Sequence, residues 1–85
     1  MTDDSSRLKR PLQPMPQDIA ERLEADGLRQ KFDSRPAYQR NDYLGWIARA
    51  KRVETREKRI AQMLRELGEG TRYMNMAWRA AERQT

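Results

Sequence analysis

The sequence predicts an all-α fold, a small bundle of three main helices plus one short helical piece, with flexible termini. Apolar residues recur at helical spacing, and prolines and glycines stand where helices are expected to begin and end. One stretch near the C-terminus alternates like a strand, but no second strand is predicted to pair with it. The 85 residues are 36% hydrophobic and 36% charged, so we expect one small domain with a modest core.

Proline and glycine positions divide the first half of the chain. Residues 1–15 are rich in proline and charge and poor in apolar side chains, so they are expected to form a flexible arm. Pro16 suits the first turn of a helix over 16–26, and Gly27 suits its end. A short helical piece over 28–33 is then predicted by two apolar residues four positions apart.

The direction of the apolar stripe divides the second half of the chain into two predicted helices. Counted at about 100° per residue from Tyr43, the stripe rotates by about a third of a turn before Ile60. One straight helix cannot bury both parts against one core, so the chain must turn near 51–55. We therefore predict helices over 36–51 and 54–67, the second ended by glycines.

Residues 71–85 permit two interpretations. The alternation of Met74, Met76 and Trp78 fits a strand, whereas the four-residue spacing from Met74 to Trp78 fits a helical turn. Without a partner strand we expect a loosely ordered tail or a short helix, following a helical domain over 16–70. The predicted core is Ile19, Leu23, Leu28, Phe32, Tyr43, Trp46, Ile47, Ile60, Met63, Leu64 and Leu67.

The residues that the chain lacks narrow its chemistry. It has no cysteine and no histidine, which excludes disulfides, thiolate nucleophiles and the commonest metal ligands and general bases. No serine lies in a nucleophile elbow or a glycine-rich phosphate loop. We therefore predict no catalytic, cofactor-binding or metal residues, no cofactor and no enzymatic activity. No signal peptide or membrane span is recognisable, so the expected location is cytoplasmic.

A dense motif occupies residues 43–60, YLGWIARAKRVETREKRI. Its positions Y-x-x-W-I-x-x-A-K-x-x-E-T-R-x-x-R-I are Tyr43, Trp46, Ile47, Ala50, Lys51, Glu54, Thr55, Arg56, Arg59 and Ile60. In this pattern the chain resembles the YdeI/OmpD-associated (bacteriocin-protection-like) family, over residues 16–70. Many relatives carry proline where this chain has Val53, and larger relatives attach this small C-terminal helical module to another domain. The resemblance implies a bacterial accessory module, linked to envelope stress or bacteriocin protection rather than to a known reaction.

Basic residues gather in the same segment. The chain carries a net charge of +5, and residues 49–59 hold six basic and two acidic side chains. The candidate interaction or anion site is Lys51, Arg52, Glu54, Thr55, Arg56 and Arg59. We expect this basic turn to bind a protein partner of unknown identity. The alternative is a nucleic-acid or phosphate-binding face, which the sequence favours less because no base-reading helix is evident.

Arg56 stands out because it falls on the apolar stripe with Ile60 and Met63. One interpretation is structural: its guanidinium bridges the turn to Glu54, to a carbonyl at the end of the preceding helix, or to Asp42. The other interpretation groups Arg56 with two further basic side chains, as an anion site near a helix N-terminus. These further side chains are Lys51 and Arg59.

Overall fold

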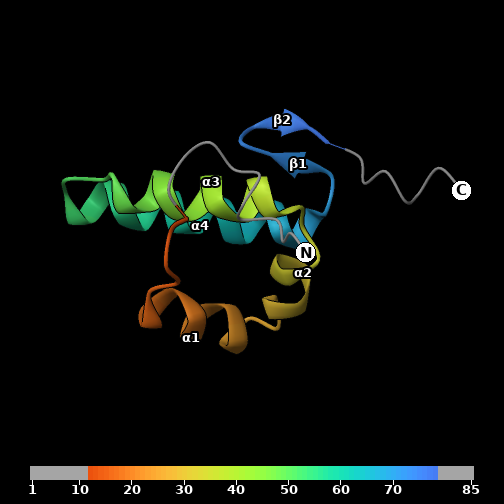
Figure 1. The fold of residues 1–85 in the computed structure, drawn as a ribbon, viewed down its shortest axis with the longest axis horizontal. Coiled ribbons are helices and arrows are strands. Elements are labelled where there is room, and N and C mark those ends of the chain that lie inside the picture. The colour runs from red at the N-terminus through yellow and green to blue at the C-terminus, as the bar shows by residue number, and fades with distance from the viewer. Residues whose placement is uncertain (1–11, 79–85) are drawn as a thin grey trace, which may run out of the picture.

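The computed structural model describes residues 12–78, and the fold is helical, as predicted (Figure 1). Residues 1–11 and 79–85, which belong to the expected arm and tail, lie outside the described residues. The helices are α1 (Gln17–Ala25), α2 (Arg29–Asp33), α3 (Ala37–Ala48) and α4 (Val53–Glu69). Two short strands follow, β1 (Arg72–Tyr73) and β2 (Met76–Ala77). The two longest helices, α3 and α4, lie side by side, with α1 and α2 on one side of the pair and the hairpin at the C-terminal end of α4 (Figure 1).

The helix ends follow from backbone chemistry. Pro16 precedes α1 with φ −67° and ψ 147°. Gly27 follows the helix with φ +69°, a backbone conformation that residues with a side chain rarely adopt. The helix expected to end at residue 67 continues to Glu69, because Gly70, with φ +78°, is the terminating residue. Helix α3 ends earlier than predicted, at Ala48, so the turn before α4 is longer than expected.

The core is built from side chains of all four helices and of β1. Its buried apolar side chains are Ile19, Leu23, Phe32, Tyr43, Leu44, Ile47, Ile60, Met63, Leu67 and Tyr73. Three residues predicted for the core, Leu28, Trp46 and Leu64, are partly buried and pack against it. Leu44 and Tyr73 are core residues that the sequence interpretation omitted.

The C-terminal segment corrects the prediction of a short helix or loose tail. It forms an antiparallel hairpin in which Tyr73 pairs with Met76. The two residues between them, Met74 and Asn75, have φ of 51° and 65°, the signature of a type I′ turn. The alternating stretch therefore does have a partner strand, which is β1. This strand directly precedes it and has only two residues, too few to show an alternating pattern in the sequence.

The segment before α1 also contacts the helices. The Gln13 N–H donates a hydrogen bond to Asn41 Oδ1 at 2.6 Å, and Met15 packs against the core. Both residues were expected to belong to a flexible arm. Their contacts hold the extended segment against α3. In Figure 1 the first coloured part of the trace leads from the α3–α4 pair down to α1.

Candidate functional site

The basic segment predicted as the site forms the turn between α3 and α4. Arg49 ends α3, and Arg52, in an extended conformation with φ −114° and ψ 150°, directly precedes α4. The exposed residues here include Lys51, Arg52 and Glu54. The other predicted site residues are partly buried on the first turns of α4; these are Thr55, Arg56 and Arg59. The structure thus divides the predicted site into an exposed turn and an inward-facing group.

Arg56 is bound within the fold. Its guanidinium donates two hydrogen bonds to Asp18 of α1, Nη1 to Oδ2 at 2.7 Å and Nη2 to Oδ1 at 3.0 Å. These hydrogen bonds, together with the positive charge, lower the pKa of the Asp18 carboxyl and raise that of Arg56. Arg56 is therefore the structural bridge of the first interpretation, but it joins α4 to α1, a partner that none of the proposed alternatives named.

Arg59 is also bound within the fold. Its Nη1 donates to the backbone carbonyl of Trp46 at 2.6 Å, and its guanidinium lies 5.2 Å from the centre of the Trp46 ring. A carbonyl in the last turn of a helix lacks an intrahelical donor, so Arg59 satisfies the end of α3 and links it to α4. The anion site that would have grouped Lys51, Arg56 and Arg59 is accordingly reduced to Lys51.

A small mixed surface remains accessible around the start of α4. We call it the turn surface and define it as Lys51, Arg52, Val53 and Glu54. Val53 is 76% exposed, the highest value among the large apolar side chains that are exposed in the described part of the chain. Within residues 12–78 no ion pair or side-chain hydrogen bond engages Lys51 or Arg52. The turn surface therefore offers two cations and one apolar contact.

A second cluster, which the sequence interpretation missed, is buried at the opposite end of the helix pair. Glu66 is 2% exposed, and its carboxylate accepts hydrogen bonds from the Tyr43 hydroxyl at 2.5 Å and from Gln62 Nε2 at 3.2 Å. It also accepts the backbone N–H groups of Met74 at 2.8 Å and Asn75 at 2.7 Å. Glu66 thereby holds the type I′ turn of the hairpin.

These contacts set the protonation state of the cluster. Burial by itself raises the pKa of Glu66, but the hydrogen bonds from Tyr43, Asn75 and Met74 outweigh it, so the pKa lies below the ordinary value. Burial and the neighbouring carboxylate raise the pKa of the Tyr43 hydroxyl above its ordinary value. The pair is therefore a phenol donating to a carboxylate, a stable arrangement at neutral pH.

Arg35 completes the cluster from the α2–α3 linker. It is 4% exposed and donates to Gln39 Oε1 at 3.0 Å, to the Glu66 carbonyl at 3.1 Å and to the Arg72 carbonyl at 2.9 Å. Its guanidinium also lies 4.3 Å from the centre of the Trp78 ring. Arg35 therefore fastens the hairpin to the helices.

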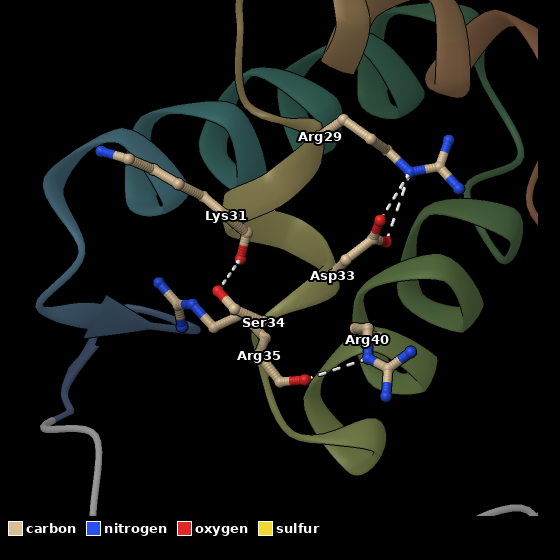
Figure 2. Close-up of polar contacts among 6 residues, drawn as sticks. All are labelled: Arg29, Lys31, Asp33, Ser34, Arg35 and Arg40. Carbon is tan, nitrogen blue, oxygen red and sulfur yellow. Dashed lines mark hydrogen bonds and ion pairs between the residues drawn. The ribbon is translucent and has the colours of Figure 1, made fainter. Parts of the chain in front are cut away.

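Short-range contacts position Arg35. Figure 2 shows its side chain directed toward the hairpin, while its own carbonyl accepts a hydrogen bond from Arg40 Nε at 3.0 Å. Just before it, the Ser34 hydroxyl donates to the Lys31 carbonyl at 3.0 Å, which closes the end of α2 (Figure 2). The linker is thus fixed on both sides of Arg35.

One sequence signal could have revealed this cluster. Glu66 lies three positions after Met63 and about 60° from it around the helix, at the edge of the apolar stripe of α4. An acidic residue that is buried at the edge of such a stripe needs hydrogen-bonding partners, and its presence there predicts a polar network. Those partners could not be named, because the amides that bind Glu66 belong to a turn that the sequence did not predict.

Comparison with protein families decides the identity of the domain. The model of the family described as "Bacteriocin-protection, YdeI or OmpD-Associated" matches residues 14–70. The chain belongs to this family. The resemblance inferred from residues 43–60 is thereby confirmed. Comparison with curated proteins and with solved structures finds no match.

In this YdeI/OmpD-associated chain the motif residues serve two purposes. Tyr43 and Ile60 are buried in the core, and Arg56 and Arg59 join helices. Lys51 and Glu54 remain exposed, as do the neighbours between them. The described helices include none long and apolar enough to cross a membrane, and the described side chains form no group of acidic residues suited to a metal ion.

Proposed function

We propose that this YdeI/OmpD-associated domain is a non-enzymatic accessory module that binds a protein partner through the turn surface. The observation that carries the proposal is Val53, 76% exposed between the two cations and Glu54. Covering one aliphatic side chain of this size contributes about 1.5–3 kcal/mol. The adjacent cations would select a partner surface that carries carboxylates.

The two arginines engaged inside the fold weigh against the phosphate-binding alternative. Arginine binds phosphates through its planar fork, which can donate two hydrogen bonds at once. The fork of Arg56 is directed to Asp18, and Arg59 donates to the Trp46 carbonyl. Glu54 adds a negative charge at the turn itself, which would repel a phosphate. These features favour a protein surface over a nucleic acid.

The family description suggests the setting of this interaction. It names bacteriocin protection and an association with another protein, and neither phrase names a reaction. A module that acts by binding fits that description without requiring a catalytic group. Under this proposal the domain contributes to protection by engaging a partner protein.

Photo-crosslinking from the turn surface tests the proposal. A benzophenone amino acid replaces Val53 in the full chain, and the same group at exposed Ala61 of the same helix provides the control. We expect a discrete protein adduct from position 53 and none from position 61. Lys51→Glu combined with Arg52→Glu should abolish the adduct. Equal labelling from both positions, or an adduct that resists the charge reversal, would contradict the proposal.

A titration separates the nucleic-acid alternative. Amide NMR spectra of the protein are followed while short duplex DNA, single-stranded DNA or RNA is added at two salt concentrations. We expect residues 49–59 to show no saturable shifts. Shifts at these residues that weaken steeply with salt would favour phosphate binding instead, because counterion release gives that binding a strong salt dependence.

A further inference from the structure

A stripe along α3 contacts the extended segment that precedes α1. Asn41, Gly45 and Arg49 follow one another at four-residue intervals, so one side of the helix presents all three. The Gln13 N–H donates to Asn41 Oδ1 at 2.6 Å, and Asn41 is only 4% exposed. We call these three residues the α3 slot and residues 12–16 the strap.

Gly45 is the middle residue of the α3 slot and is in close contact with the strap. Glycine is unfavourable in a helix interior compared with alanine, so its presence here needs a reason. A Cβ at this position would lie 3.3 Å from Gln13 Cγ and 3.3 Å from Arg49 Nη1. The three atoms nearest to that position all belong to these two side chains. Glycine thus lets Gln13 of the strap pack closely against the helix.

Two prolines restrict the backbone of the strap. Pro14 and Pro16 each restrict the preceding residue to an extended backbone. Pro16 itself has φ −67° and ψ 147°, a polyproline II conformation. Met15 packs against the core, whereas Leu12 is 62% exposed. A segment that is already extended loses little conformational freedom on binding, which favours docking.

We infer that the α3 slot is a binding site for an extended, proline-flanked peptide segment, and that the strap occupies it as a removable internal ligand. The Asn41 carboxamide accepts a backbone N–H of the segment, and Gly45 allows the close approach. Arg49 offers hydrogen-bond donors at the end of the slot. A partner segment of the same chemistry would displace the strap. This inference is independent of the proposed function of the turn surface.

Competition with a free peptide tests the inference. Gln13→Pro in the full chain removes the strap's N–H donor and leaves α3 unaltered. The probe is a synthetic peptide with the sequence of residues 10–17, RPLQPMPQ. We expect saturable NMR shifts of the Asn41 side-chain amide and the Gly45 backbone amide. Wild type should need at least about tenfold more peptide for half-saturation, because its attached strap competes at a high effective concentration.

A blocked slot is the matched control. Gly45→Leu fills the middle of the slot and should abolish the peptide-induced shifts. Equal shifts in this variant would overturn the inference, and so would the lack of saturable shifts in Gln13→Pro. Hydrogen exchange on wild type gives a second test that needs no variant. The Gln13 amide should exchange at least about tenfold faster than the α3 interior, through local opening. Exchange only by global unfolding would show that the strap is not removable.

Discussion

The Glu66 carboxylate stabilises the fold, because its oxygens accept hydrogen bonds from one phenol hydroxyl and two backbone N–H groups. The side chain is buried, so water cannot replace these donors. Glu66→Gln replaces one acceptor oxygen by an N–H donor and removes the charge. We expect this to lower the free energy of unfolding by about 2–3 kcal/mol, measured by urea denaturation. Exposed Glu69 of the same helix supplies the control, and Glu69→Gln should have little effect. Equal losses would contradict the assigned role.

Arg56 should contribute less, because its ion pair with Asp18 is partly solvated. The Arg56 side chain is 30% exposed and that of Asp18 is 49% exposed. Arg56→Ala should lower the free energy of unfolding by about 0.5 kcal/mol. A double-mutant cycle with Asp18→Ala measures the pairwise part, since a real bridge makes the double variant less destabilised than the two single losses added together. Full additivity would mean that the two side chains act independently.

At the scale of elements, the hairpin depends on two residues with positive φ. Asparagine tolerates this left-handed conformation, whereas alanine is strained in it by about 1–2 kcal/mol. Asn75→Ala should therefore lower the free energy of unfolding by about 1 kcal/mol. Asn75→Gly, which can adopt the same turn, serves as the comparison in the same denaturation experiment. A loss as large with glycine as with alanine would indicate that the Asn75 side chain, rather than its backbone, stabilises the hairpin.

Helices α3 and α4 show what the spacing of apolar residues can predict about helix bounds. The rotation of the apolar stripe predicted a turn near 51–55, and the structure turns just before Val53. A stripe reports which side of a helix is buried, so a change in its direction reports a change in helix direction. The sequence predicted the end of α3 less precisely, because the Trp46 carbonyl in its last turn accepts a hydrogen bond from Arg59 of another helix.

The molecule as a whole should lose stability in acid. Hydrogen bonds from Arg56 lower the pKa of Asp18, and hydrogen bonds that outweigh burial lower that of Glu66. A carboxyl with a lowered pKa binds protons more weakly in the folded than in the unfolded state. Its contribution is therefore complete above about pH 5 and disappears as the pH falls through its folded-state pKa.

Denaturation of wild type between pH 7 and pH 3 measures this dependence. Stability should be nearly constant at the upper end and decline steadily below about pH 4.5. Glu66→Gln should decline less steeply, because its amide does not titrate. A variant curve parallel to that of wild type would assign the acid sensitivity to other carboxyls.

The sequence by itself determined the helical fold, the approximate helix bounds, most of the core and the family. These depend on local properties: apolar spacing, proline and glycine at helix ends, and a contiguous motif. It also located the basic turn, whose exposed residues Lys51 and Arg52 lie beside Val53.

Tertiary structure decided which charged side chains remain accessible. Arg56 binds Asp18 across 38 positions, and Arg35 binds the Glu66 carbonyl across 31. Partners so distant in the chain are chosen by how the helices pack, and no local pattern encodes them. The hairpin likewise depends on Glu66, since its short strands acquire their stability from a helix that presents the right acceptor to their turn.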